Sequence, residues 1–383
     1  MPSDHEHPFS AAQGRPLHNV EGLHQGATER LSELGINDAE QLVAVTAVPQ
    51  MLEGLSQHLK VAPEELTQAV EAARKTLPEY LANELSRPLQ SQFALGAMLP
   101  TSTSTAAAAK LMMKPVASAL AAAALPTSVN HAGSMGPVKN QGSRGTCVAF
   151  GSTALHEYWN IVIGRPQKFS EQFLYEEIKR VDGHPNDCGT WLVYAVQVLK
   201  NLGECLESVW GYNPNPPCNH NGTEPANART NAAQYKITAH MLNAKDVHAI
   251  KTSLAGNSNV PFCIPVYNSW YQSAETKRTG RITMRIGNEP RVGGHCMCFV
   301  GYQDDRASPG GGYFILRNSW GPNNWGSQCP YGAGNGTIPY QYIANDATEA
   351  AAMPARIRRV ASSGRARKAA KSARKAAKSK RRG

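Results

Sequence analysis

The sequence predicts an α+β domain, preceded by a small all-α domain and followed by a cationic tail. Three observations predict this organisation. The first ninety residues are polar and helix-compatible, glycine, proline and aromatic residues become frequent from about residue 125, and lysine and arginine dominate the last thirty residues. With 383 residues, 41% of them hydrophobic, the chain can bury two or three cores, which excludes wholesale disorder.

The formal net charge of +10 at pH 7 arises at one end of the chain. From Pro354 onward there are 13 Lys and Arg residues and no Asp or Glu. The rest of the chain has 26 basic and 29 acidic residues, and its first ninety residues hold 13 acidic against 6 basic ones. The positive charge therefore concerns the partner of the tail and says nothing about the chemistry of the other domains.

Several classes of protein are disfavoured by the sequence. The first residues carry no secretory signal, and the longest apolar stretch, Val116 to Leu125, is too short to span a bilayer. The eight cysteines form no CxxC pair, so a structural zinc site is not expected. We therefore expect no metal, no cofactor and no membrane association, and a cytoplasmic location.

Residues 1–16 are expected to be disordered, and residues 17–86 to form a helical module. The pattern predicts helices from Ala27 to Leu34, from an Asp38 cap to Val45, and from Pro63 to Lys75. Residues 29–40 are approximately repeated at 53–65, which indicates two stacked helical hairpins. The stretch Val20 to Ala27 resembles the turn of helix-hairpin-helix domains, which implies contact with phosphate.

Two departures weaken that implication. The position of the second glycine of the motif is occupied by His24, and the module is acidic overall. A protein-interaction module is therefore favoured over a DNA-binding one. Residues 87–124, rich in Ala, Ser and Thr, are interpreted as a structureless linker.

The α+β domain is expected over residues 125–345. Apolar periodicity predicts helices at 147–162, 170–181 and 190–202 in its first half. Short β-like runs follow in its second half, at Val260–Tyr267, Arg281–Ile286, His295–Tyr302 and Tyr313–Arg317.

Three residues of this domain form a constellation with chemical potential. Cys147 follows a Gly-rich loop and begins a helix, where partial positive charge favours a thiolate. His295 follows two glycines at the start of a β-like run, and Asn318 lies in Asn-Ser-Trp-Gly, where its amide can fix an imidazole tautomer. Taken singly, each residue has an ordinary structural interpretation. Cys, His and Asn in this order, with intervals of 148 and 23 residues, are typical of a thiol nucleophile with its base and orienting group.

Residues 125–345 resemble papain-like cysteine proteases. The resemblance rests on Gly136–Gly142, Phe169–Leu174, the asparagine motif at 318–321 with Trp325-Gly326, and Gly334–Tyr340. It implies a two-lobed fold, with a helical lobe and a β-barrel lobe, and a protein or peptide substrate held between them. It also implies a catalytic set of Cys147, His295, Asn318 and Gln141, and substrate-binding residues Gly189, Thr190, Gly294 and Trp320. In this set Gln141 and the Cys147 N–H are the oxyanion-hole donors.

The chain departs from the family pattern beside the nucleophile. Arg144 occupies the position of a family disulfide cysteine, which favours a reducing compartment, and Val148 replaces a tryptophan. No pro-segment spacing of the cathepsin kind is found upstream, so the N-terminal module is not expected to act as such a pro-segment. Autoinhibition by another route is left open.

The region 346–383 is interpreted as a disordered tail that contains the heptad Ala-Arg-Lys-Ala-Ala-Lys-Ser twice. It resembles the tails of linker histones and nucleoid proteins, which implies binding to DNA or RNA and a nucleoid-associated location. The candidate contacts are Arg367, Lys368, Lys371, Arg374, Lys375, Lys378, Lys380, Arg381 and Arg382. A solvated tail without a specific partner is the alternative.

The sequence thus predicts a papain-like cysteine endopeptidase that acts through an acyl-enzyme and is localised by its tail. Two alternatives are a catalytically silent nucleic-acid adaptor on the same fold and an amide-transferring, transpeptidase-like enzyme.

Overall fold

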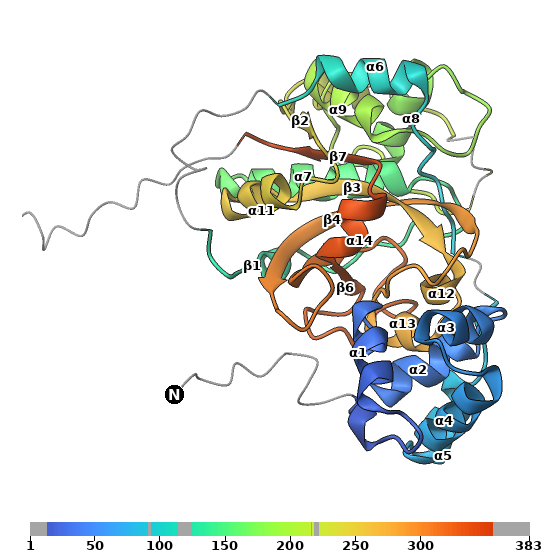
Figure 1. Cartoon of the computed structure of the whole chain (residues 1–383). Helices are drawn as coiled ribbons and strands as arrows, with labels where there is room; N and C mark the ends of the chain where they lie inside the picture. Colours follow the sequence, from blue (N-terminus) through green and yellow to red (C-terminus); the bar gives the residue numbers. More distant parts are fainter. Residues whose placement is uncertain (1–13, 91–92, 114–124, 216, 218–221, 355–383) are drawn as a thin grey trace, which may run out of the picture.

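The computed structural model describes residues 14–90, 93–113, 125–215, 217 and 222–354. It has three parts: a helical module at one end, a β-rich lobe in the middle and a helical lobe at the other end (Figure 1). The predicted α+β class and the small all-α domain are both observed. Residues 1–13 and the tail from 355 onward lie outside the described residues, and so do the candidate nucleic-acid contacts.

The N-terminal module is built from short helices whose starts follow from local sequence. The Asp38 carboxylate accepts the N–H of Gln41 at 2.8 Å, which confirms the predicted cap, and Pro63 occupies the first turn of its helix. Buried leucine, valine and alanine side chains from all the helices form the core of the module. The elements are η1 (Leu17–Asn19), α1 (Gln25–Glu33), α2 (Ala39–Thr46), α3 (Met51–Leu59), α4 (Pro63–Lys75) and α5 (Glu79–Leu85).

The β-rich lobe is an antiparallel sheet in the order β2-β7-β3-β4-β5-β6, with β1 also paired to β4. The long β4 carries His295 into the middle of the molecule, between β3 and β5. The strand β7 lies beyond the predicted domain end at 345, so the domain extends at least to Ala352. The strands are β1 (Ser128–Asn130), β2 (His240–Leu242), β3 (Val260–Tyr267), β4 (Arg291–Asp304), β5 (Gly312–Arg317), β6 (Asn335–Pro339) and β7 (Glu349–Ala352).

Helices surround the sheet and form the second lobe. The long α7 packs against β3 and β4, and it begins at Cys147, as the sequence predicts. The helical lobe contains α7 (Cys147–Val162), α8 (Glu171–Val181), α9 (Leu192–Asn201) and α10 (Ala228–Ala232). The β-rich lobe carries η2 (Ala132–Ser134), α11 (Val247–Ala255), α12 (Asn268–Tyr271), α13 (Ala274–Thr279) and α14 (Tyr340–Asp346).

The predicted strand at Arg281–Ile286 is wrong. Only Arg281 makes an isolated bridge, to Thr337 of β6, and the rest of the run is not a strand. Its alternating apolar side chains instead pack on the N-terminal module, and the Met284 N–H donates to the Leu34 carbonyl at 2.9 Å. The module and the β-rich lobe therefore share one apolar core.

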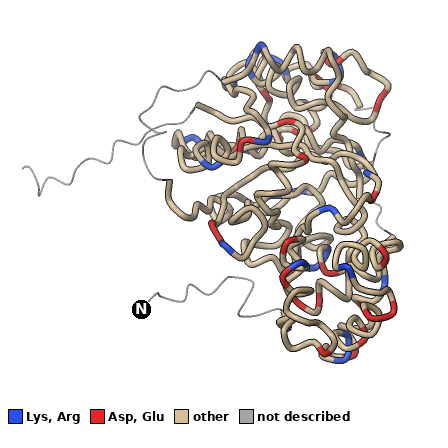
Figure 2. The backbone as a smooth tube through the Cα atoms, in the orientation of Figure 1, with Lys and Arg blue, Asp and Glu red and all other residues tan. Residues whose placement is uncertain are grey.

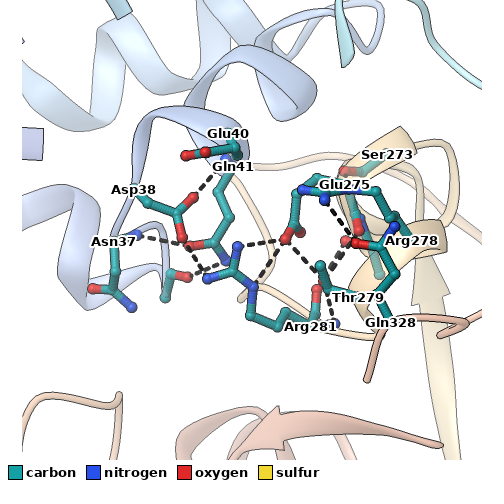
Figure 3. A network of polar contacts seen from close by, with 12 residues as sticks. Asn37, Asp38, Glu40, Gln41, Ser273, Glu275, Arg278, Thr279, Arg281 and Gln328 are labelled. Atoms are coloured by element: carbon teal, nitrogen blue, oxygen red, sulfur yellow. Dashed lines mark hydrogen bonds and ion pairs between the residues drawn. The ribbon is translucent and has the colours of Figure 1, made fainter. Parts of the chain in front are cut away.

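A buried ionic network reinforces this junction (Figure 3). The Arg281 guanidinium contacts the Asp38 carboxylate of the module and the Glu275 carboxylate of its own lobe. All three side chains are buried. Asp and Glu, interspersed with Lys and Arg, gather on the module and at this junction (Figure 2).

Where the structure describes the interval 87–124, at 87–90 and 93–113, it is not the structureless linker that the sequence predicts. It contains a helix, α6 (Ser102–Lys110), which begins with a capping box between Thr101 and Ser104 and contacts α9. Its residues Phe93–Leu99 run in extended form between the two lobes, as described below.

Candidate active site

Cys147 is the first residue of α7 and is completely buried. Its Sγ accepts a hydrogen bond from the backbone N–H of Cys296, the residue after His295, at 3.4 Å. The nucleophile candidate on the helical lobe therefore meets the histidine strand of the β-rich lobe. Burial raises the pKa of the Cys147 thiol to about 12, and the N–H groups directed at its sulfur only partly oppose this effect.

His295 is oriented as the sequence predicts. Its Nε2 lies 2.8 Å from Oδ1 of Asn318, which also accepts the Ser319 N–H at 2.7 Å. Because this amide oxygen only accepts, the Nε2 atom carries the proton, and in the neutral ring Nδ1 keeps its lone pair. Trp320 stacks on the imidazole with ring centroids 4.4 Å apart and shields the bond from water.

Burial favours the uncharged forms of both the imidazole and the thiol. Burial lowers the pKa of His295 to about 4, although the hydrogen bond to Asn318 opposes the shift. With a thiol pKa of about 12, Cys147 is protonated at neutral pH. The buried pair is therefore a neutral imidazole and a neutral thiol.

Gln141 is held rigidly at the start of residues 141–146, here called the nucleophile loop. Its Oε1 accepts the Ser319 hydroxyl at 2.6 Å, and its Nε2 donates to the Arg144 carbonyl at 2.8 Å. A second bond from Nε2, at 3.2 Å, reaches the carbonyl of Ala94. Since Oε1 is fixed, the amide nitrogen is directed toward the cleft.

The extended segment Phe93–Leu99, here called the cleft segment, fills the space between the lobes. On one side the Ala97 N–H donates to the Gly294 carbonyl at 3.1 Å. On the other side Thr190 donates to the Gly96 carbonyl and accepts from the Met98 N–H, both at 2.9 Å. The Gly96 N–H donates to the same Gly294 carbonyl at 3.1 Å and also lies near the Cys147 thiol.

The four predicted substrate-binding residues all border this segment. Thr190 and Gly294 pair with its backbone, and the Trp320 indole donates to the Ala94 carbonyl at 3.2 Å. A Cβ added to Gly189 would lie 2.9 Å from the Gly96 carbonyl oxygen, so a glycine is needed there for close approach. The structure thus brings the predicted catalytic and substrate-binding residues together at one cleft.

Sequence reasoning missed the cleft segment. Its one local signal is the apolar run around Gly96, which stands out from the polar residues of the interval. In the part of the chain that the structure describes, no group of three or more His, Cys, Asp or Glu side chains could hold a metal ion. None of the described helices is long and apolar enough to cross a membrane.

Comparisons with known proteins identify the family. Residues 125–337 match the model of the papain family cysteine proteases, more than half of the chain. The chain belongs to this family. An uncharacterized peptidase C1-like protein of Acanthamoeba polyphaga mimivirus is 24% identical over 215 residues, 54% of this chain and 65% of the relative. Chymopapain of Carica papaya is 28% identical over 212 residues and 51% of each chain. The chain thus spans between half and two thirds of these relatives.

Among solved structures, the papain-family domain is similar to xylellain, a cysteine protease from Xylella fastidiosa. The two are 28% identical with a TM-score of 0.56, and the match covers 70% of this chain and 98% of that one. The match is longer than the family domain alone.

One family departure bears on the expected compartment. Although Arg144 replaces a family disulfide cysteine, Cys188 of this papain-family domain is disulfide-bonded. Disulfides are typical of oxidising compartments. The cytoplasmic location expected from the sequence stays a prediction.

Proposed function

We propose that this chain is a latent cysteine endopeptidase with Cys147 as nucleophile and His295 as general base. The observation that carries the proposal is the orientation of the imidazole. The bond from Nε2 to Asn318 leaves the basic Nδ1 on a histidine whose neighbour, Cys296, hydrogen-bonds the Cys147 sulfur. No side chain on the described part of the chain hydrogen-bonds Nδ1, so this atom is free to take the thiol proton.

The reaction follows from these groups. Cys147 transfers its proton to Nδ1 of His295, and the thiolate attacks the peptide carbonyl carbon. The oxyanion of the tetrahedral intermediate accepts from Nε2 of Gln141 and from the Cys147 N–H, which has no acceptor within its helix. The imidazolium then gives its proton to the departing amine, and water, activated by the same imidazole, hydrolyses the thioester.

The cleft segment accounts for the latency. It pairs with Thr190 and Gly294, the residues proposed to pair with substrate, and so competes for the same backbone hydrogen bonds. Its Gly96 N–H also lies near the Cys147 thiol, so the segment occupies the space beside the nucleophile. Opening of the cleft would rehydrate the pair and allow it to ionise.

Cleavage of a denatured protein by the full-length chain and by Cys147→Ala tests the chemistry. Each is assayed as such and in a background in which the cleft segment is displaced by Gly96→Leu. We expect the displaced chain with Cys147 to cleave and its Cys147→Ala counterpart to be inactive. Equal cleavage by both would exclude Cys147 as the nucleophile. Adding an amine nucleophile to the same assay distinguishes amide transfer from hydrolysis.

We also propose that the region from Pro354 onward retains the protease on nucleic acid. The support is its charge of 13 Lys and Arg without any acidic residue. Within the N-terminal module, the His24 ring caps the first helix by accepting the Ala27 N–H at 3.1 Å, so this amide is already occupied. Because the module packs on the β-rich lobe, we propose that its partner is the papain-family domain of the same chain. Loss of salt-sensitive DNA retention in a chain ending at Ala352 would support the tail, and unchanged retention would contradict its role.

A further inference from the structure

The loop before the nucleophile is anchored by a buried arginine. Arg144 is 1% exposed although it carries a large polar guanidinium group. Its Nη1 donates to Oε1 of Gln172 at 2.9 Å and to the carbonyl of Asn213 at 2.8 Å. The Asn213 N–H donates to the same Gln172 oxygen at 3.2 Å, so the three groups hold one another in place.

Two tyrosines enclose this guanidinium. Its central carbon lies 5.5 Å from the ring centre of Tyr175 and 5.2 Å from that of Tyr212. Cation–π contacts of this kind are strongest when they are shielded from water. The arginine therefore fixes the positions of two rings as well as its own backbone.

The hydroxyl groups of the two tyrosines form hydrogen bonds to different edges of the cleft. The Tyr212 hydroxyl donates to the Gln141 carbonyl at 2.8 Å and lies 2.7 Å from the Thr146 hydroxyl, so it ties together both ends of the nucleophile loop. The Tyr175 hydroxyl donates to the Cys188 carbonyl at 3.1 Å, just before the edge formed by Gly189 and Thr190.

The two edges also lie in direct contact. A Cβ added to Gly145 would come within 2.1 Å of the Cys188 carbonyl oxygen. Such close approach requires that the loop be fixed relative to this edge. Arg144 does so through its contacts with Tyr175 and Tyr212. Arg144 stands at the position that the family resemblance gives to a disulfide cysteine, and here hydrogen bonds and cation–π contacts anchor that position.

We propose that Arg144 and Tyr212 are positioning residues that hold the oxyanion-hole donor Gln141 in register with the substrate-binding edge. This proposal rests on the proposed peptidase function. Arg144 touches neither substrate nor reacting atoms and acts through the Gln141 loop. A single nitrogen, Nη1, satisfies both acceptors while the planar guanidinium lies over two rings. A lysine ammonium supplies the donors but has no flat face for the rings, and methionine supplies neither.

Amide hydrogen exchange on the full-length chain tests the proposal independently of activity. In Arg144→Met and in Tyr212→Phe we expect faster exchange in residues 141–146, and in Arg144→Met also in 188–190, with unchanged exchange in β3. Arg144→Lys should resemble Arg144→Met. Arg229→Met and Tyr313→Phe are the matched controls, because they remove a helical-lobe arginine and a tyrosine hydroxyl away from the loop. Exchange that rises everywhere, or nowhere, would overturn the proposal, and so would full restoration by lysine.

Steady-state kinetics in a background with the cleft segment displaced supply the second readout. We expect kcat to fall about 10- to 100-fold in Arg144→Met, since displacement of an oxyanion donor by about 1 Å has this order of effect. KM should change by a smaller factor than kcat, because Thr190 and Gly294 keep their backbone groups for pairing with substrate although the edge at 188–190 is looser. A loss confined to KM would contradict a role at the oxyanion hole. If Cys147→Ala retains activity, the proposed function fails, while the exchange data still decide the role of Arg144.

Discussion

The carbonyl oxygen of Gly96 accepts a hydrogen bond from the N–H of Thr190 at 2.9 Å, so a segment of the chain itself is bound at the edge of its own cleft. Met98 returns a bond of the same length to the Thr190 carbonyl. The cleft of this papain-family domain is therefore able to bind an extended backbone, and it does so with the chain that precedes the domain.

Displacing the cleft segment should activate the enzyme. A Cβ at Gly96 would come within 2.1 Å of the Gly145 carbonyl oxygen, so Gly96→Leu cannot be seated in the present position. We expect cleavage of a denatured protein to rise at least about tenfold, since a blocked fraction above nine tenths would be released. A fluorogenic peptide assay on the full-length protein measures this rise.

The matched control is Gly133→Leu, because a Cβ at Gly133 meets no atom within 4 Å. This variant should have wild-type activity. The idea would be contradicted if Gly96→Leu were no more active than the wild type while unfolding at the same temperature and keeping Cys147 buried. The segment would then not control access to the cleft.

The reactivity of Cys147 should depend on pH in a way that reports the closed cleft. With a thiol pKa of about 12, the native full-length chain should be alkylated slowly at pH 7, and the rate should rise about tenfold per pH unit without a plateau below pH 10. In Gly96→Leu, rehydration stabilises the thiolate–imidazolium pair, so the rate should be high and nearly flat around neutral pH. Site-resolved mass spectrometry after iodoacetamide pulses measures both rates. A neutral-pH plateau in the wild type would contradict a neutral resting pair.

The Arg281 network should stabilise the docked module. Arg281→Met leaves the buried carboxylates of Asp38 and Glu275 without their cation, which typically costs about 3–5 kcal/mol in the free energy of unfolding. Urea denaturation of the full-length chain measures this free energy. Arg74→Met is the control, since its pair with Glu71 is half exposed and contributes at most about 1 kcal/mol.

Substitution of Asp38 separates its two roles. Asparagine is an equally good helix cap, so Asp38→Asn should retain α2 while losing the charge that faces Arg281. We expect a smaller loss than in Arg281→Met, because Glu275 still neutralises the arginine. If Asp38→Asn matched wild type in stability, the contact would contribute nothing to docking.

Much of the fold could be predicted because its signals are local. The helix at 147–162 and the strand at 260–267 have the observed ends, since apolar periodicity and short flanking loops determine both. The pairing of His295 with Asn318 was also predictable, because the two residues lie in motifs only 23 residues apart. His295 lies in β4 and Asn318 directly follows β5, and these two strands are neighbours in the sheet.

The missed features depend on contacts between distant segments. The alternation of Ile282 and Met284 is a strand pattern, yet these side chains are buried against the N-terminal module and not within the sheet. The cleft segment similarly acquires its extended form from Thr190 and Gly294, residues about 100 and 200 positions away. The local sequence propensities of a segment do not indicate which distant residues it will contact.

Removal of the Gln141 side chain should affect the rate of the chemical step more than binding. Its Nε2 is the only side-chain donor proposed for the oxyanion hole, so Gln141→Ala should lower kcat about 10²- to 10³-fold with KM nearly unchanged. The measurement is made in the Gly96→Leu background, in which Ala94 no longer occupies that amide. Gln341→Ala, which removes an exposed amide of α14, should leave both constants unchanged. In the wild-type chain the Ser319 hydroxyl donates to Oε1 of Gln141 at 2.6 Å, and this bond holds the amide in one orientation. A Gln141→Ala enzyme with wild-type kcat would therefore place the oxyanion elsewhere in the cleft.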